Sequence, residues 1–187
     1  MRELVLSSEQ IHGICKDIGA KLTARLKDEE KLPVFIGVMK GGLNFMMDLI
    51  KNVDMPILTD YIQISSYSGT ESTGIINLKK DITMDCKGHT VVIVEDVIDT
   101  GYSMEYLKRF IAGKHQPKNI IVCALFSKEK MRKTQVRIDY CGKVLNENKF
   151  LVGYGLDYNE LFRNTPYVFV PSPDEVEGYD KLLKEKN

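Results

Sequence analysis

Residues 91–94, which read VVIV, constrain the fold of this chain more than any other stretch. Four β-branched residues in a row favour a strand, because branched side chains pack well on a pleated surface. No polar side chain interrupts the run, so neither face of the strand can lie against water. That is the pattern of parallel sheets with helices on both faces. We therefore expect an α/β fold in which helices flank a mostly parallel sheet.

The rest of the chain alternates between strand and helix patterns, as such a fold requires. Ser7 and Gln10 stand at capping-box spacing, and apolar residues then recur at helical spacing up to residue 26. A second helix is expected after Gly42, and Ser103 can cap a third. The further strands that we expect are residues 34–38, 57–64, 120–126, 136–140 and 167–170.

The domain organisation is expected to be simple. The chain has 187 residues with no internal repeat, linker or low-complexity segment, and this length suits one domain, residues 1–187. We expect the segments at its two ends to pack on the same core as a small hood subdomain. Residues 65–74 are small and polar with only one bulky side chain, which is typical of a mobile loop.

The composition limits the classes of partner. Lysine and arginine together number 26, as do aspartate and glutamate, so no net field draws the chain to nucleic acid or to a membrane surface. No apolar run has the length of a membrane span or of a signal peptide, which makes the cytoplasm the expected location. The cysteines lack Cys-x-x-Cys spacing and are expected to be reduced core thiols. They are Cys15, Cys86, Cys123 and Cys141.

The segment after the buried strand is the candidate active site. In open α/β sheets, ligands bind beyond the carboxyl ends of strands, where the next helix presents unpaired backbone N–H groups. Glu95 and Asp96 place two carboxylates there, and residues 99–103, DTGYS, offer a tight turn, hydroxyls and a helix start that attracts phosphate. This suits a ligand with a phosphate at one end and hydroxyls or magnesium at the other.

On spacing alone an alternative stays open, namely strand-end acids followed by an ordinary Asp-Thr-Gly turn. The two common nucleotide-binding patterns, G-x-x-x-x-G-K-[ST] and G-x-G-x-x-G, do not occur in the sequence.

Four stretches of the chain resemble motifs of one family. Residues 91–104, VVIVEDVIDTGYSM, resemble the phosphoribosyl-pyrophosphate loop of the type I phosphoribosyltransferases, most of all in the hypoxanthine-guanine branch. Residues 38–42, VMKGG, resemble the pyrophosphate loop of that branch, and Ser66-Tyr67 resembles its flexible lid. Residues 150–160, FLVGYGLDYNE, together with Arg163, resemble its purine-closing motif. The four blocks stand in the family's order.

The resemblance implies an activity. The family joins a purine to C1 of a ribose that carries a 5-phosphate and a 1-pyrophosphate, with magnesium, and releases pyrophosphate. For this chain it implies purine salvage, in which phosphoribosyl pyrophosphate and hypoxanthine, and guanine as well, give IMP or GMP. It also implies a homo-oligomer, a dimer or a tetramer, while the balanced charge predicts neither nucleic acid nor membrane as a partner.

The resemblance further implies roles for the matching residues. Asp99 would be the catalytic residue, which takes or holds the proton of purine N7. Lys128 would donate to purine O6 and Phe150 would stack on the ring, with Leu151 also binding substrate. The implied magnesium ligands are Glu95, Asp96 and Asp157, of which the first two would also hold the ribose hydroxyls.

The two phosphate ends of the substrate would be held by other matching residues. The 5-phosphate would be wrapped by Asp99, Thr100, Gly101, Tyr102 and Ser103, mostly through backbone N–H groups. The pyrophosphate would be held by Lys40 and Gly41, in a loop of unusual peptide geometry, and by Arg163. Ser66 and Tyr67 would close over it and exclude water.

Three alternatives stay open. Lys130 lies close to Lys128 in the chain and could contact the base in its place. Xanthine or another oxopurine could be the preferred base. The chain could also be a regulator that binds nucleotides with this fold but acts on RNA or DNA, which a basic face on the folded surface would favour.

Overall fold

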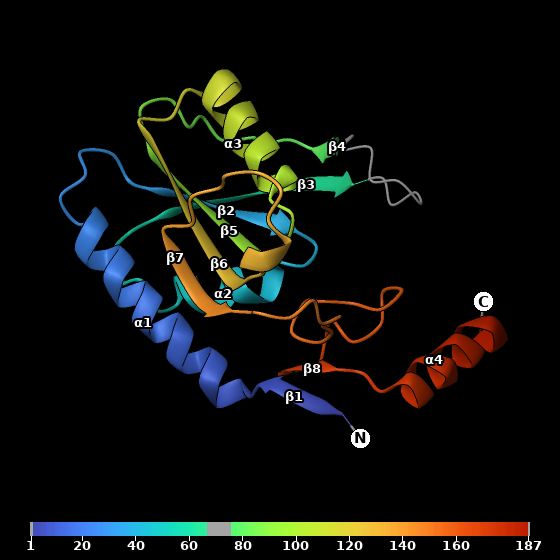
Figure 1. The fold of residues 1–187 in the computed structure, drawn as a ribbon. Coiled ribbons are helices and arrows are strands. Elements are labelled where there is room, and N and C mark those ends of the chain that lie inside the picture. The colour runs from blue at the N-terminus through green and yellow to red at the C-terminus, as the bar shows by residue number, and fades with distance from the viewer. Residues whose placement is uncertain (1, 67–75, 187) are drawn as a thin grey trace.

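A six-stranded sheet forms the centre of the computed structural model, which describes residues 2–66 and 76–186 (Figure 1). The strand order is β4-β3-β2-β5-β6-β7, and every neighbouring pair is parallel except the edge pair of β3 and β4. The strands are β2 (Val34–Met39), β3 (Leu58–Ser66), β4 (Ile76–Lys80), β5 (Thr90–Ile98), β6 (Asn119–Ser127) and β7 (Tyr140–Val144). The expectation of a mostly parallel sheet is confirmed.

Helices cover both faces of this sheet (Figure 1). They are α1 (Ser8–Leu26) and α2 (Leu43–Ile50) on one face and α3 (Tyr102–His115) on the other. Side chains of a strand point alternately to the two faces. Val92 and Val94 therefore pack in the core under α1 and α2, whereas Val91 and Ile93 pack in the core under α3. All four are fully buried, which is why the sequence tolerates no polar residue there.

The first helix begins at the predicted capping box. Ser7 Oγ accepts a hydrogen bond from the Gln10 N–H at 3.2 Å, and Gln10 Oε1 accepts one from the Ser7 N–H at 2.9 Å. Each side chain thus satisfies a backbone donor that the helix start would leave unpaired.

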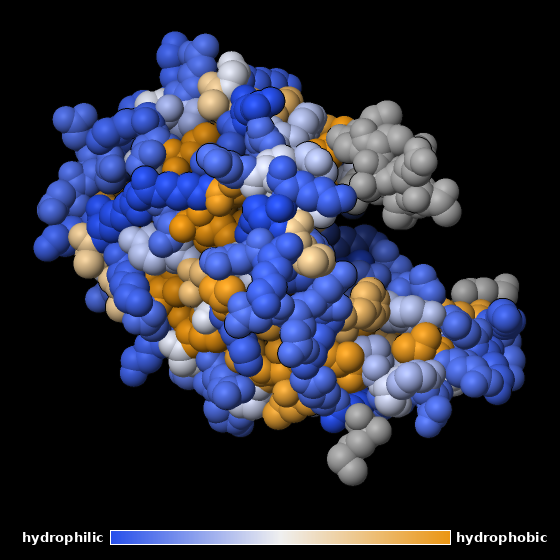
Figure 2. Space-filling view, in the orientation of Figure 1, coloured by the Kyte–Doolittle hydropathy of each residue, from blue (hydrophilic) through white to orange (hydrophobic). Residues whose placement is uncertain are grey.

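The two ends of the chain form the hood. Strand β1 (Glu3–Leu6) pairs antiparallel with β8 (Val168–Val170), and α4 (Pro173–Lys186) follows (Figure 1). The small two-stranded sheet confirms the expected hood. In Figure 2 the surface is hollowed on its right side, between the part that carries β3 and β4 and the part that carries α4.

Two local predictions are wrong. Residues 136–140 do not form a strand, because β7 begins only at Tyr140; Val136 and Ile138 alternate as in a strand but pack on the core from an irregular segment. Ser103 does not cap α3. The cap is Gly101, with φ 91°, and among residues 2–66 and 76–186 no side chain caps the helix start. Strands β1 and β4 and helix α4 are further elements that the sequence patterns did not reveal.

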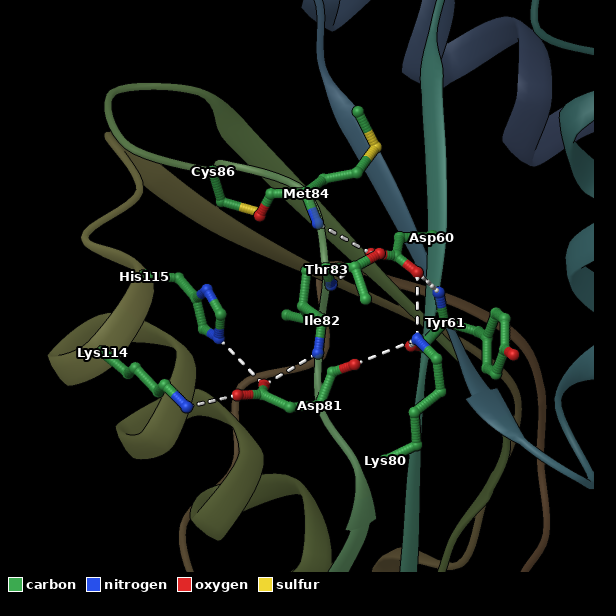
Figure 3. A network of polar contacts seen from close by, with 10 residues as sticks. All are labelled: Asp60, Tyr61, Lys80, Asp81, Ile82, Thr83, Met84, Cys86, Lys114 and His115. Carbon is green, nitrogen blue, oxygen red and sulfur yellow. Dashed lines mark hydrogen bonds and ion pairs between the residues drawn. The ribbon is translucent and has the colours of Figure 1, made fainter.

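A polar network fixes the segment that leaves the edge strand β4 (Figure 3). Asp60, whose side chain is 6% exposed, accepts hydrogen bonds from the backbone N–H groups of Tyr61, Thr83 and Met84. Burial alone would raise the pKa of Asp60, but these hydrogen bonds outweigh it and hold the pKa below its ordinary value. Asp60 therefore stays charged and ties residues 83–84 to β3.

The cysteines are free thiols, as expected, and Cys15, Cys86 and Cys123 are buried. Among residues 2–66 and 76–186, no helix combines the length and the apolar character needed to cross a membrane.

Candidate active site

The register of β5 and β6 brings Asp99 and Lys128 together. The two strands run parallel with Ile98 opposite Ser127, so the next residue of each strand leaves the sheet at the same place. The Lys128 N–H donates to the Ile98 carbonyl at 3.0 Å, which continues the ladder by one more bond. Lys128 Nζ then lies 3.1 Å from Asp99 Oδ2 and 3.2 Å from Asn148 Oδ1.

Burial distinguishes the members of this group. The Lys128 side chain is 10% exposed, whereas that of Asp99 is 44% exposed. The carboxylate thus faces the site, with a buried ammonium group behind it. Lys130 lies on a short 3₁₀ turn, η1 (Glu129–Met131), where it is exposed. Of the two lysines that the sequence left open, Lys128 is the one in contact with Asp99.

The turn after Asp99 presents the start of α3 to solvent. Gly101 has a left-handed conformation, φ 91°, which glycine adopts without steric cost. A β-carbon on Gly101 would lie 2.7 Å from Thr134 Oγ1, so the segment that contains Thr134 also leaves no room for a side chain at this position. Because no side chain in the described part of the chain caps α3, its first N–H groups and the adjoining residues Thr100, Tyr102 and Ser103 are available to an anion.

Glu95 and Asp96 end up side by side in the last part of β5, which runs four residues beyond the predicted stretch 91–94. The Asp96 N–H donates to Glu95 Oε1 at 3.2 Å. Burial, and then the neighbouring charge of Asp96, raise the pKa of Glu95 well above its ordinary value. Burial also raises the pKa of Asp96, although hydrogen bonds and the charge of Arg163 oppose the rise. The charge of Arg163 therefore does not compensate fully for the burial of the pair.

This chemistry fits a divalent cation bound with its substrate. A cation would offset the burial that raises both pKa values, and also the charge of Asp96 that adds to the rise for Glu95. Within the described ranges, no cluster of three or more His, Cys, Asp or Glu side chains could hold a metal by itself. Magnesium is commonly bound by one or two carboxylates together with substrate phosphates and water, so the pair is sufficient for that mode. Asp157 does not join the pair; its Oδ1 lies 2.7 Å from Arg163 Nη2.

The loop between β2 and α2 packs tightly against this acidic pair. A β-carbon built on Gly41 would lie 1.8 Å from Asp96 Oδ2, and one on Gly155 would lie 2.2 Å from the Gly41 carbonyl oxygen. The peptide bond between Met39 and Lys40 is cis. Gly41 therefore lies between the Asp96 carboxylate and the hood loop, which comprises residues 145–167 between β7 and β8, and a larger residue there would have to displace one of them.

The hood loop supplies the remaining predicted residues. Phe150 is 55% exposed and meets Tyr158 edge to face, with ring centroids 6.0 Å apart, while Leu151 is buried beside it. Arg163 Nη1 donates to the Gly155 carbonyl at 2.6 Å, and the Arg163 carbonyl accepts from Asn44 Nδ2 at 2.9 Å. These bonds join the loop to helix α2 and place the guanidinium near Gly41.

The structure thus brings together most of the predicted residues, at the carboxyl ends of β2, β5 and β6. Tyr67 lies outside the described residues, and Ser66 is described only through its backbone at the end of β3.

Two residues of the site were not assigned a role from the sequence. Asn148 accepts from Lys128, and nothing in its loop sequence signals this contact. Glu160 accepts from both Lys40 and Arg163. The sequence did offer one signal for Glu160, because it lies three residues before Arg163 and this spacing allows an ion pair between the two side chains.

Comparison with known proteins gives one family. A family model described as the phosphoribosyl transferase domain matches residues 7–159. The chain is 37% identical over 176 residues to a hypoxanthine-guanine phosphoribosyltransferase of Staphylococcus aureus, covering 93% of this chain and 96% of the relative. It is 39% identical over 173 residues to the enzyme of that name from Streptococcus pneumoniae, covering 91% and 93%. A crystal structure of a hypoxanthine phosphoribosyltransferase from S. aureus superposes with a TM-score of 0.85 at 36% identity, covering 92% of each chain.

Proposed function

The chain belongs to the phosphoribosyltransferase family, in its hypoxanthine-guanine branch, and from this we propose the reaction that it catalyses. It transfers the 5-phosphoribosyl group from phosphoribosyl pyrophosphate to hypoxanthine, and to guanine as well. The products are IMP or GMP and pyrophosphate, and the enzyme serves purine salvage. The relatives named above carry the corresponding activity in their names.

One observation from the structure supports this function most directly, namely the pairing of Asp99 with Lys128 at 3.1 Å. On a 6-oxopurine, O6 and N7 are neighbours on one edge of the ring. O6 accepts hydrogen bonds, and N7 carries the proton that must leave or be held during transfer. Lys128 is a donor only and an ionised Asp99 is an acceptor only, so the pair offers that edge a donor beside an acceptor.

We assign the base-binding roles accordingly. Asp99 holds or removes the N7 proton while another ring nitrogen attacks C1, and Lys128 donates to O6. The exposed face of Phe150 stacks on the purine, and Leu151 lies next to it. Asn148 keeps Lys128 oriented toward the base, because it accepts a second bond from the same Nζ.

The ribose phosphate end is assigned to β5 and α3. The start of α3, with Thr100, Gly101, Tyr102 and Ser103, binds the 5-phosphate through unpaired backbone donors. Glu95 and Asp96 lie next to it and hold the ribose hydroxyls. As pyrophosphate leaves, C1 becomes positively charged, and the two carboxylates stabilise that charge. Bound magnesium supplies charge neutralisation for the phosphates and for these carboxylates.

The pyrophosphate end is assigned to the cations of the β2–α2 loop and the hood loop. Lys40 and Arg163 are the charged donors, and Gly41 lets the backbone approach closely. Asp157 holds the Arg163 guanidinium and is proposed as a further ligand of magnesium once substrate binds. By resemblance, Ser66 and Tyr67 close over the pyrophosphate.

Initial rates with four bases test the proposal. At saturating phosphoribosyl pyrophosphate and magnesium, hypoxanthine and guanine should react, adenine should not, and xanthine should be poorer. A preference for xanthine would establish the alternative in which xanthine, rather than hypoxanthine or guanine, is the natural base. Absence of transfer to any base, combined with binding to RNA or DNA, would establish the regulatory alternative. Removing magnesium with a chelator should abolish transfer.

We extend the proposal to the state of the protein. It forms a homo-oligomer, a dimer or a tetramer, and it works in the cytoplasm, as members of this family do. Residues 1–187 make one domain, with the hood built from the terminal segments. Light scattering and limited proteolysis of the purified chain would test the oligomer and the single domain.

A further inference from the structure

Glu160 joins the two cations that the proposed function assigns to pyrophosphate. Its Oε2 atom accepts hydrogen bonds from Lys40 Nζ at 3.0 Å and from Arg163 Nε at 3.1 Å. The Glu160 side chain remains 63% exposed and that of Lys40 54% exposed. The bridge therefore lies at the open mouth of the site, where a ligand arriving from solvent can reach it.

The backbone directs Glu160 to this place. Its φ of 68° is left-handed, which is uncommon for a residue other than glycine, and its N–H donates to Asp157 Oδ2 at 2.9 Å. Asp157 also pairs with Arg163, so the loop closes on itself. This backbone conformation turns the Glu160 carboxylate toward the β2–α2 loop, where it contacts Lys40. Packing does not explain this orientation, because the side chain is mostly exposed.

The carboxylate carries charge at this position. Hydrogen bonds from Arg163, and then from Lys40, hold the pKa of Glu160 below its ordinary value. A negative group thus contacts both cations at the place where phosphate oxygens have to bind. The single N–H of Arg163 Nε cannot bond Glu160 and an incoming phosphate at once, and the Lys40 ammonium group, which has three donors, would hold the phosphate next to the Glu160 carboxylate if it bonded both.

We propose that Glu160 is a resident counter-ion that pyrophosphate displaces from Lys40 and Arg163, and that re-forms its contacts as pyrophosphate leaves. The inference rests on the proposed function, since it deepens the role of the same site. Exposed ion pairs are individually weak, so the carboxylate yields to a multiply charged ligand that magnesium accompanies. The contacts of Glu160 with the two cations would lower the affinity of the site for pyrophosphate and would speed the release of that product.

The test is the binding of magnesium pyrophosphate to the full chain, measured by titration calorimetry with Glu160→Gln. The amide keeps the size of the side chain and removes the charge. At low ionic strength the variant should bind pyrophosphate about 3- to 10-fold more tightly than the parent, as expected for the loss of a weak competing pair. At about 0.5 M salt the difference should shrink, because exposed charges are screened.

Two controls separate this effect from a change in net charge or in structure. Asp17→Asn removes an equally exposed carboxylate from the Asp17–Lys21 pair on α1 and should leave pyrophosphate binding unchanged. In a Lys40→Met background, Glu160→Gln should increase the affinity for pyrophosphate by a smaller factor than in the parent, because one of the two partners of Glu160 is already absent. A merely structural Glu160 would weaken binding and would show no such coupling.

The outcomes decide between the inference and the function on which it rests. Unchanged or weaker pyrophosphate binding by Glu160→Gln at low salt overturns the inference, while binding by the parent still supports the proposed function. If the parent binds no pyrophosphate, both are overturned.

Discussion

Lys128 Nζ lies 3.1 Å from Asp99 Oδ2, so a buried cation stands directly behind the half-exposed carboxylate of the phosphate loop. The contact follows from the parallel register of β5 and β6, in which Ile98 faces Ser127. The register therefore brings together two residues 29 positions apart in the sequence, one proposed to act in catalysis and the other in base choice.

The first prediction concerns Asp99. Asp99→Asn should keep the fold and phosphate binding but lower turnover with hypoxanthine, because an amide cannot accept the N7 proton. A positioned acid or base contributes about 10²–10⁴-fold, and the loss should lie in that range. The measurement is kcat by steady-state kinetics, with the thermal melting temperature as a check of the fold. Turnover within a few-fold of the parent would exclude Asp99 as the base.

The second prediction concerns the choice of base. Adenine carries an amino group where hypoxanthine carries O6, so a donor would face the Lys128 ammonium group and neither would be paired. A site built around a hydrogen bond rejects such an analogue by about 10⁴–10⁵-fold. Lys128→Ala should therefore lose activity with 6-oxopurines and much of the discrimination. The measurement is kcat/KM for both bases.

Lys130→Ala is the matched control for this experiment, because Lys130 is exposed on η1, whereas Lys128 is the lysine that pairs with Asp99. It should behave like the parent. A loss of preference in Lys130→Ala alone would assign the base contact to Lys130, and equal use of adenine by the parent would refute the 6-oxopurine assignment.

The third prediction concerns the acidic pair in the absence of magnesium. Burial and the charge of Asp96 raise the pKa of Glu95 above its ordinary value of 4.5. The folded protein then holds this proton more tightly than the unfolded chain does. Folding takes up protons between the two pKa values, so stability should fall as the pH rises through that window.

Glu95→Gln removes the charge that causes this loss. The variant should melt at a higher temperature than the parent at neutral pH without magnesium, by about 2–4 °C for each kcal/mol recovered. Its activity should fall, because Glu95 is proposed to hold the ribose hydroxyls and magnesium. Melting curves between pH 4.5 and pH 8, without magnesium, would check the sign. If the stability of the variant fell more steeply with rising pH than that of the parent, the prediction would be wrong.

The sequence predicted the parts of the site that depend on one strand and the turn after it. Residues 91–94 had to be a covered strand, and the acids, the turn and the helix start follow in order. The contact of Lys128 with Asp99 depends on the register between two strands, which residue patterns do not contain. The resemblance to a family implied a role for each of the two residues but not the contact between them.

The hood loop was still harder to foresee. Asn159, Glu160 and Phe162 have φ values of 47°, 68° and 75°, although none is a glycine. Local preference gives no reason to expect this conformation at Glu160 and Phe162, because left-handed backbone is unusual for such residues, whereas asparagine adopts it more readily. They arise from long-range contacts, such as the hydrogen bond of Tyr158 to Asp180 on α4. For the same reason, residues 136–140 were misassigned, since their alternating pattern serves packing rather than pairing.

The last prediction concerns Gly41, which packs against the acidic pair. A β-carbon there would lie 1.8 Å from Asp96 Oδ2, so Gly41→Ala must push the carboxylate or the loop aside. A displacement of about 1 Å in a positioned group can cost about 10²-fold in rate. We expect kcat/KM to fall by that order, with KM for phosphoribosyl pyrophosphate raised. The backbone of Gly41 is not left-handed, so alanine itself imposes no conformational strain there.

Gly13→Ala is the control, because Gly13 lies within α1 and a β-carbon there meets nothing within 4 Å. Alanine favours a helix interior over glycine by about 0.5–1 kcal/mol, so this variant should melt at a slightly higher temperature and keep full activity. The two variants add the same methyl group, one in open space and one against Asp96. If Gly41→Ala also keeps full activity, the close approach of Gly41 to Asp96 is not needed for the reaction. If it loses activity while still melting cooperatively near the parent's temperature, the loss belongs to the site, because the fold is intact.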